Sequence, residues 1–279
     1  MKIINKEILV KNSDRRVVKI ELLASVIAQK ARPGQFVVVM VHEKGERIPL
    51  TVVDKNLQTG TVTLIFQEIG LTTKLLGRLN QGDEFYALIG PLGHASQIQN
   101  FGRVVLVGGG VGVAEIYPVA KALKEAGNHV QAILGARSKD FFILEKEIKD
   151  VCDEFYAVTD DGSYGRRAFT TDILKELLED EKPDYVYSVG PIPMMKIVSS
   201  LTQQKKIKTV VSLNALMVDA TGMCGCCRVS IAGHVQFSCV DGPEFDAHQV
   251  DWLELEQRNR MYEQQEQHVC RLLEKRGLE

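Results

Sequence analysis

The first hundred residues alternate short apolar runs with polar turns, a pattern typical of an antiparallel β-domain. Turn-forming residues separate the runs, as at Asn12–Asp14, Arg32–Gly34 and Gln81–Asp83. Many short strands at this spacing predict a barrel or a sandwich. One stretch, Thr72–Leu79, has a helical pattern instead. The strand-like runs are Lys2–Val10, Val17–Leu23, Gln35–Val41, Gly60–Gln67 and Glu84–Ile89.

From Arg103 onward, strand-like runs alternate with helical ones. Val104–Val107 is a continuous apolar run that ends in glycines, and Ala114–Ala126 then has a helical pattern that contains Pro118. Such alternation predicts a doubly wound parallel sheet, whose strands are apolar throughout because both faces are buried. The later elements expected are strands His129–Leu134, Phe155–Thr159, Tyr185–Val189 and Thr209–Leu213, with helices Phe141–Lys149, Thr170–Leu178 and Met194–Gln204.

These patterns divide the chain into four predicted parts, with the first boundary at Gln97–Gly102. A β-barrel covers 1–100, an α/β domain 101–213, a cysteine-rich segment 214–245 and a helical tail 246–279. In the tail, Trp252–Lys275 lacks glycine and proline and has few apolar positions, so we expect a helix. It either packs weakly on its own domain or docks on a partner.

Composition excludes several classes of protein. The 279 residues are 45% hydrophobic and 25% charged, with a formal net charge of -2, which does not indicate a nucleic-acid surface. No apolar run approaches the roughly 20 residues of a membrane span. The charged N-terminus is unlike a signal peptide. We therefore expect a cytoplasmic protein with reduced thiols, and Cys152 and Cys270 as inert packing residues.

A glycine loop follows the first strand of the predicted sheet: Gly108, Gly109, Gly110, Val111 and Gly112. Backbone N–H groups in such a loop, with the N-terminus of the next helix, form a site for anions. Glycine also lets a pyrophosphate approach the backbone. The fingerprint G-x-G-x-x-G is incomplete, because valine follows where the last glycine should stand. The alternative is a tight turn without a ligand.

Further loops follow later strands of the same sheet. Asp160 and Asp161 come after the third strand, and Gly190 and Pro191 after the fourth. The carboxyl ends of parallel strands meet at one edge, where such sheets bind nucleotides. These loops therefore favour a nucleotide ligand. Arg137 follows the second strand, where an acidic residue would indicate NAD, so NAD and NADP both stay open.

Two motifs in the β-domain are candidates for phosphate contacts. Arg47 offers a planar guanidinium, and Pro49 restricts the backbone beside it. The turn at Gly70 precedes the short helix, whose N–H groups and hydroxyls suit a second contact. Each motif is weak alone, but their order before a nucleotide-type sheet is specific. The residues are Arg47, Pro49, Leu50 and Thr51, followed by Gly70, Thr72 and Thr73.

With its motifs in this order, the chain resembles the ferredoxin reductase-type flavoproteins over roughly residues 1–212. The resemblance implies FAD on the barrel and a nicotinamide dinucleotide, NAD(H), on the sheet. It implies that the Arg47 and Gly70 motifs contact the flavin and its pyrophosphate, and it adds Gln67 to the cofactor contacts. The segment Gly190, Pro191, Met194 and Met195 matches the family's late G-P-x-x-M-M motif.

The cysteine-rich segment holds four of the six cysteines, so disulfides, zinc and an iron–sulfur cluster are the candidates. A reducing compartment disfavours disulfides. Structural zinc commonly takes two pairs of ligands, whereas only Cys224 and Cys227 have pair spacing; Cys239 and His234 would complete a Cys3His site. Glycines between the thiols allow the tight loop of a [2Fe–2S] cluster, which we favour.

A closer resemblance concerns these ligands. Cys224, Cys227 and Cys239 match the last three ligands of the C-x4-C-x2-C…C pattern in the electron-transfer subunit of bacterial dihydroorotate dehydrogenase. Asp219 stands at the first ligand position, which is similar to the small subunit of NADH-dependent ferredoxin:NADP oxidoreductase. The resemblance implies that Asp219 is the fourth ligand and Cys226 a spare thiol. In the alternative, Cys226 replaces Asp219, although adjacent side chains diverge.

The predicted function is electron transfer among NAD(H), FAD and a [2Fe–2S] cluster. No acid–base pair or nucleophile stands out, so no catalytic residue is expected beyond the cofactors. The resemblance implies a larger partner subunit that carries flavin and iron–sulfur clusters, in a heterodimer or higher complex. It also implies that ferredoxin reacts only indirectly, through this complex, and that the complex bifurcates electrons. The alternatives are a dihydroorotate dehydrogenase electron-transfer subunit and a zinc-stabilised nucleotide-binding module without redox activity.

Overall fold

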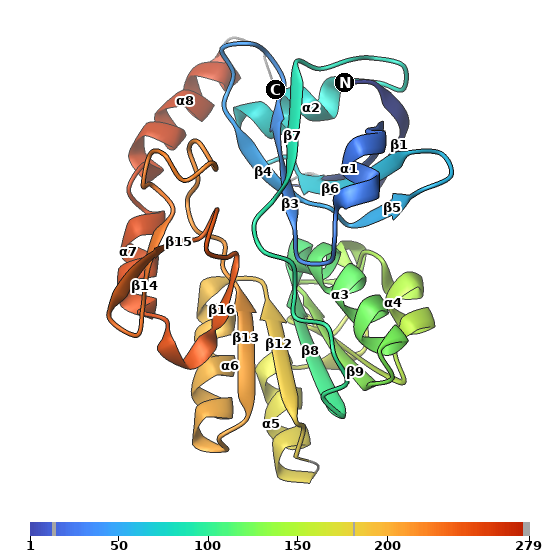
Figure 1. The fold of residues 1–279 in the computed structure, drawn as a ribbon, viewed down its shortest axis with the longest axis vertical. Coiled ribbons are helices and arrows are strands. Elements are labelled where there is room, and N and C mark those ends of the chain that lie inside the picture. Colours follow the sequence, from blue (N-terminus) through green and yellow to red (C-terminus); the bar gives the residue numbers. More distant parts are fainter. Residues whose placement is uncertain (13–14, 181, 276–279) are drawn as a thin grey trace.

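The computed structural model describes residues 1–12, 15–180 and 182–275. Its N-terminal part consists of two antiparallel sheets packed face to face, with strand orders β1-β2-β6-β5 and β4-β3-β7 (Figure 1). The predicted antiparallel β-domain is thereby confirmed. The elements are β1 (Ile3–Lys11), β2 (Arg16–Leu23), α1 (Ser25–Lys30), β3 (Phe36–Met40), β4 (Ile48–Thr51), β5 (Asp54–Asn56), β6 (Thr61–Gln67), α2 (Leu71–Arg78) and β7 (Ala87–Leu92).

Strand β3 is buried on both faces. Val37 and Val39 point into the core between the two sheets of the β-domain. Phe36, Val38 and Met40 point the other way, into a second core that contains residues from the C-terminal third of the chain. Since side chains alternate along a strand, one run of five apolar residues can join two cores.

The central sheet has the order β11-β10-β9-β8-β12-β13-β16, and its strands from β11 to β13 are parallel. This confirms the predicted doubly wound sheet. Its elements are β8 (Arg103–Gly109), α3 (Val113–Glu125), β9 (His129–Ala136), α4 (Glu145–Val151), β10 (Glu154–Thr159), β11 (Arg166–Arg167), α5 (Thr170–Asp180), β12 (Tyr185–Val189), α6 (Ile192–Gln204), β13 (Lys208–Ser212) and β16 (Glu244–Asp246).

Helices cover both faces of this sheet. On β8, Val104 and Leu106 pack with residues of α3 and α4, whereas Val105 and Val107 pack with α5 and α6. All four side chains are fully buried. The continuous apolar run in the sequence therefore reflects burial on two faces.

Strand β16 is an element that the sequence did not predict. It comes from the cysteine-rich segment and pairs antiparallel with β13 at the sheet edge. This strand has only three residues, which are too few for the alternation of apolar and polar positions typical of a strand to be recognised in the sequence. The cysteine-rich segment also forms a hairpin of β14 (Arg228–Ile231) and β15 (His234–Phe237).

Two helix predictions were wrong in their limits. One helix was expected at Phe141–Lys149. The chain instead forms a 3₁₀ turn at Lys139–Phe141, and helix α4 begins only at Glu145. The stretch Trp252–Lys275 is divided into α7 (Trp252–Asn259) and α8 (Glu263–Lys275). Leu255 of α7 is buried in the C-terminal core, whereas α8 leaves that core and contacts α2 of the β-domain (Figure 1). The tail therefore packs on two different parts of the chain, α7 on the C-terminal core and α8 on the β-domain.

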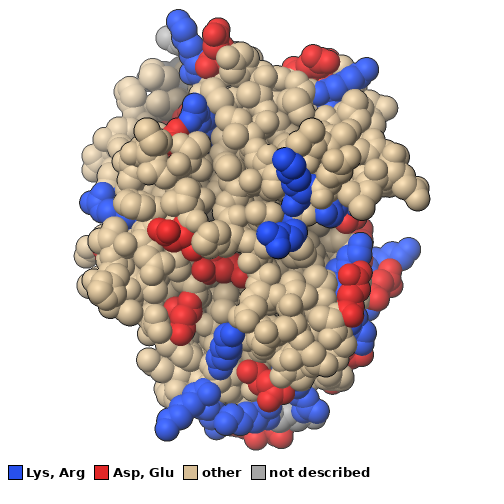
Figure 2. All heavy atoms as spheres, viewed as in Figure 1, with Lys and Arg blue, Asp and Glu red and all other residues tan. Residues whose placement is uncertain are grey.

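On the face shown in Figure 2, acidic and basic side chains are interspersed, and no extended basic surface is in view. This agrees with the formal net charge of -2. None of the described helices combines the length and apolar character that crossing a bilayer requires.

The side chain of Asn128 ties the linker between the β-domain and the central sheet to that sheet. Its Oδ1 accepts hydrogen bonds from the N–H groups of Phe101 (2.7 Å) and Gly102 (3.2 Å). Its Nδ2 donates to the carbonyl oxygens of Gln99 (2.9 Å) and Leu123 (2.7 Å). Asn128 is 3% exposed, so water cannot readily replace these partners.

We expect Asn128→Ala to lower the free energy of unfolding by roughly 3 kcal/mol, because buried backbone groups lose their partners. Urea denaturation followed by circular dichroism measures this change. The matched control is Gln99→Ala, which removes an exposed side chain and should change stability by no more than about 0.5 kcal/mol. Equal stability of the two variants would contradict the assigned role.

Candidate functional site

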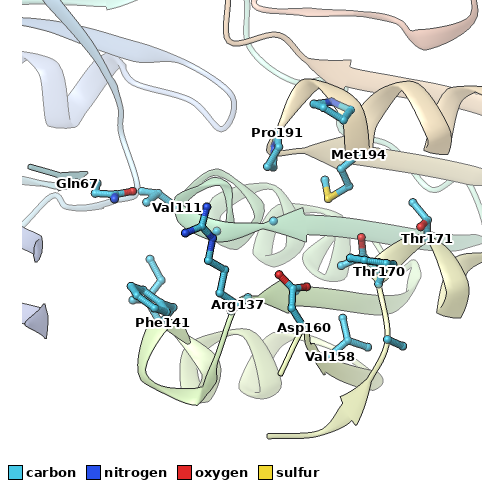
Figure 3. Close-up of a pocket in the computed structure, with 18 of the residues that line it drawn as sticks. Gln67, Val111, Arg137, Phe141, Val158, Asp160, Thr170, Thr171, Pro191 and Met194 are labelled. Atoms are coloured by element: carbon cyan, nitrogen blue, oxygen red, sulfur yellow. The ribbon is translucent and has the colours of Figure 1, made fainter. Parts of the chain in front are cut away.

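A cavity of about 510 Å³ lies over the carboxyl ends of β8, β9, β10 and β12 (Figure 3). This is the edge at which parallel sheets bind nucleotides. Eight of the predicted cofactor residues line it: Gln67, Gly109, Gly110, Val111, Arg137, Asp160, Pro191 and Met194. The structure therefore brings these eight predicted residues together at one cavity.

The glycine loop packs closely against its neighbours but leaves part of its backbone open. A Cβ at Gly109 would lie 2.8 Å from Met194 Sδ and 2.9 Å from Pro191 Cδ, and a Cβ at Gly112 would lie 2.8 Å from the Val189 carbonyl oxygen. Gly110 has a positive φ of +58° and faces open space. Side chains are thus excluded where the loop contacts α6 and β12, while Gly110 leaves its backbone accessible to a ligand.

Other predicted residues support the cavity without lining it. Gly108 packs between Leu134 and Ile116, and Gly190 lies against Gly109. The Asp161 carboxylate accepts hydrogen bonds from Ser163 N (2.9 Å) and Oγ (2.6 Å). These bonds hold the pKa of Asp161 below its usual value and fix the turn after β10.

Arg137 and Asp160 are the charged predicted residues of the cavity. In Figure 3 both side chains extend from the ends of their strands into the same space. A guanidinium suits phosphate oxygens, and a carboxylate suits ribose hydroxyls. The cavity therefore holds one group of each kind that the phosphate and ribose of a dinucleotide require.

Several lining residues were missed from the sequence. Thr170 and Thr171 begin α5, and Phe141 forms part of the apolar wall. Arg15 reaches the cavity from the β-domain, with its guanidinium 5.5 Å from the centre of the Phe141 ring. The threonines could have been found from their position at the same edge of the sheet as Asp160. Nothing in the local sequence indicates Arg15, because it belongs to the β-domain and meets the cavity only in the folded chain.

The motif residues of the β-domain lie on β4 and at the start of α2, outside this cavity. Thr73 Oγ accepts hydrogen bonds from the N–H groups of Ile69 (3.0 Å) and Gly70 (3.1 Å), which fixes the helix start. Thr72 is buried and donates to Glu46. Gly70, Thr72 and Thr73 thus build the helix N-terminus that the sequence predicted as a phosphate contact.

Arg47, the first residue of the other motif, forms an ion pair with Asp219. The Asp219 carboxylate also accepts hydrogen bonds from the hydroxyl and the N–H of Thr221, and these together hold its pKa below the usual value. The β-domain motif and the start of the cysteine loop are therefore in direct contact. Pro49, Leu50 and Thr51 follow on β4 and are half-buried.

The cysteine loop places its thiols in two surroundings. Cys227 and Cys239 are each 2% exposed, with their sulfur atoms 3.1 Å apart and no disulfide between them. Cys224 is exposed, and the backbone N–H groups of Cys226 and Asp219 point at its sulfur, which holds its pKa below the usual value. N–H groups directed at sulfur are typical of iron–sulfur sites, so the loop fits such a cluster.

The four predicted ligands do not converge on one point. Within the described chain, no three or more His, Cys, Asp or Glu side chains form a group that suits a single metal ion. A zinc ion needs its donors around one centre, whereas a [2Fe–2S] cluster distributes them over two irons. The arrangement of Cys227 with Cys239, and of Cys224 near Asp219, suits two irons better than one ion.

Comparison with known proteins identifies the family. Residues 214–251 match the iron–sulfur cluster binding domain of dihydroorotate dehydrogenase B, and residues 106–200 match the oxidoreductase NAD-binding domain. The electron transfer subunit of dihydroorotate dehydrogenase B from Geobacillus thermodenitrificans is 33% identical over 244 residues, which cover 84% of this chain and 93% of that protein. A homologue of that subunit from Thermotoga maritima is 48% identical over 240 residues, which cover 86% of this chain and 85% of that protein.

The chain belongs to the family of dihydroorotate dehydrogenase B electron transfer subunits and their homologues. It is therefore an oxidoreductase subunit with an NAD-binding domain and an iron–sulfur cluster binding domain, as predicted.

Solved structures support the same family. A chain from the NADH-dependent reduced ferredoxin-NADP oxidoreductase, studied for flavin-based electron bifurcation, superimposes with a TM-score of 0.91 at 42% identity. The match covers 100% of this chain and 98% of that one. Ferredoxin-NADP+ reductase from Plasmodium falciparum shares only the fold, with 14% identity and a TM-score of 0.58. The predicted resemblance to ferredoxin reductase-type proteins is thus confirmed.

For the cavity, we expect Arg137→Ala to weaken NADH binding about tenfold, because a charge-assisted contact to phosphate is lost. Titration calorimetry with the purified protein measures the dissociation constant. Arg166→Ala is the matched control, since Arg166 lies outside the cavity and pairs with Glu176 on the surface. If both variants bound NADH as the unchanged protein does, Arg137 would have no part in binding.

Proposed function

We propose that this chain is the electron-transfer subunit of an NADH-dependent ferredoxin:NADP oxidoreductase. The Arg47–Asp219 ion pair carries the proposal, because it joins the motif expected at the flavin directly to the cysteine loop. The dinucleotide cavity borders the same β-domain through Gln67 and Arg15. Three sites for NAD(H), FAD and a [2Fe–2S] cluster thus adjoin within one chain.

The β-domain supplies the residues that would hold FAD. The Arg47 guanidinium and the α2 N-terminus offer positive charge and N–H groups to the pyrophosphate. When bound, FAD accepts two electrons as hydride and the cluster transfers electrons one at a time. The proposed flavin contacts are Arg47, Pro49, Leu50, Thr51, Gly70, Thr72 and Thr73.

The central sheet supplies the residues that would hold NAD(H). The glycine loop offers backbone N–H groups to the pyrophosphate, and Arg137 and Asp160 flank the same space. Pro191 and Met194 form an apolar wall at the start of α6. These residues bind and orient the dinucleotide beside the β-domain and exclude water from part of it.

Asp219, Cys224, Cys227 and Cys239 are the proposed cluster ligands. The two buried thiols and the N–H groups that face sulfur support this set. A carboxylate has the same formal charge as a thiolate but is a harder donor, so it should change the reduction potential of the cluster.

A partner subunit completes the proposed enzyme. Relatives of this chain are named electron transfer subunits, which implies a second subunit that gives or receives the electrons. We propose that the partner carries further flavin and iron–sulfur groups, and that ferredoxin reacts through it. We propose that the complex is cytoplasmic, a compartment in which thiols stay reduced and can serve as cluster ligands.

The second candidate is a dihydroorotate dehydrogenase electron-transfer subunit, which the names of several relatives favour. Asp219 at the first ligand position favours the ferredoxin:NADP enzyme, whose chain also matches over the full length. Co-purification from the native organism and sequencing of the bound subunit decides between them.

Anaerobically purified protein should absorb visible light with flavin and iron–sulfur bands, and should contain about one FAD and two irons per chain. Absorption spectroscopy and metal analysis measure both. A colourless preparation that contains zinc would contradict the redox function and would support the zinc-stabilised module.

We expect Asp219→Ala to lose or destabilise the cluster, because one iron loses a ligand, while Cys226→Ala retains it. Iron content and the electron paramagnetic resonance signal of the reduced protein measure both outcomes. Cys226→Ala is the matched control, since this thiol lies two residues from Cys224 in the same loop. A normal signal in Asp219→Ala would defeat the ligand assignment.

A further inference from the structure

Helix α7 packs against the cysteine-rich segment. Its buried Leu255 lies in the same core as Cys227 and Cys239. At the C-terminal end of the helix, Asn259 Nδ2 donates a hydrogen bond to the carbonyl oxygen of Asn214 (2.7 Å), where the segment begins. The helix also contacts β14, the strand that directly follows the cysteine loop (Figure 1). These contacts hold α7 in place beside the thiols.

Arg258 is the residue of α7 that reaches into the cysteine loop. Its Nη2 donates a hydrogen bond to the carbonyl oxygen of Cys226 (3.0 Å), which belongs to the peptide bond before Cys227. Burial raises the pKa of the Cys226 thiol, and the positive charge of Arg258 opposes this rise. The charge of Arg258 therefore acts within the loop, between the proposed ligands Cys224 and Cys227.

The surroundings of Arg258 provide no carboxylate for its charge. The side chain is half-buried, and its Nε is shielded from solvent without a hydrogen-bond partner in the described chain. Glu254 lies four residues earlier on the same helix, a spacing at which Glu and Arg can pair, but these two described residues form no ion pair. A guanidinium stays charged in proteins, and a buried N–H of a charged group is costly without a partner. An anion bound in the loop would offset this cost.

A [2Fe–2S] cluster with anionic ligands is such an anion. Two ferric irons and two sulfides together carry two positive charges, so four anionic ligands leave the oxidised group with two negative charges. Reduction converts one ferric iron to ferrous and adds a third negative charge. A nearby cation stabilises the reduced form more than the oxidised form, and it therefore raises the reduction potential.

Two other cations lie near the loop. Arg47 pairs with Asp219 and is a proposed flavin contact, so a change there would affect both cofactors. Arg228 directly follows Cys227 but is exposed, so water and salt screen its charge. Arg258 combines a half-buried charge with a direct contact to the loop, and it lies outside the proposed flavin and dinucleotide contacts.

We propose that Arg258 helps set the reduction potential of the cluster, because its positive charge stabilises the reduced form. This inference rests on the proposed function, since it takes Cys224 and Cys227 as cluster ligands. Electron transfer from the reduced flavin to the cluster is then more favourable than it would be without Arg258.

The test uses the full chain with its bound FAD and cluster. Redox titration with dithionite, followed by the electron paramagnetic resonance signal of the reduced cluster, gives the midpoint potential. Arg258→Gln keeps an N–H donor but removes the charge. At the midpoint potential of the unaltered protein, the ratio of reduced to oxidised cluster should fall at least tenfold in this variant, which is a shift of about 59 mV for one electron.

Arg260→Gln is the matched control, because Arg260 is exposed at the end of the same helix and the variant loses the same charge in water. It should leave the ratio unchanged. Arg258→Lys keeps the charge without the planar guanidinium and should keep the ratio of the unaltered protein. It is also the second variant if Arg258→Gln does not take up the cluster: a tenfold lower ratio in Arg258→Lys would overturn the role of the charge.

The outcomes separate the two proposals. Unaltered protein without the signal of a reduced cluster would overturn the proposed function. A normal signal with equal midpoint potentials in the unaltered protein and in Arg258→Gln would overturn the role of Arg258 alone. A potential lowered equally in Arg258→Gln and Arg258→Lys would also overturn it, because the charge would then not be the cause.

Discussion

The fold depends on one strand that is buried on both sides. In β3, Val37 and Val39 pack into the β-domain, whereas Phe36, Val38 and Met40 pack against the central sheet and the cysteine loop. Because successive side chains of a strand point to opposite faces, the orientation of the β-domain also sets that of the other parts. Electron transfer among three sites requires such a fixed arrangement, which flexible linkers would not provide.

The second constraint is the pairing of β16 with β13. It brings the cysteine-rich segment back to the edge of the nucleotide-type sheet and places Glu244 opposite Ser212. From there the chain continues into α7, and α8 then reaches the β-domain. The C-terminal third is therefore built into both preceding parts, and its core contains Cys227 and Cys239. Packing around these thiols holds the loop in shape.

Much of the site was predictable because its chemistry lies at strand ends. The glycine loop, Arg137 and Asp160 each follow a strand of a parallel sheet, and parallel strands bring their carboxyl ends together without further information. The position of Arg15 at the cavity and the pairing of Arg47 with Asp219 were not predictable. They depend on contacts between distant parts of the chain, and no local pattern records such contacts. The division of the tail into α7 and α8 was missed as well; Leu255 of α7 packs in the C-terminal core, whereas α8 contacts the β-domain.

By itself the sequence determined the main alternation of strands and helices, the family motifs and the cysteine spacing, since these depend on local periodicity and short-range geometry. The tertiary structure alone decided two things: that β16 completes the sheet, and that Asp219 pairs with Arg47. The physical reason is common to both. Each contact joins residues far apart in the chain, and no local pattern in the sequence records such contacts.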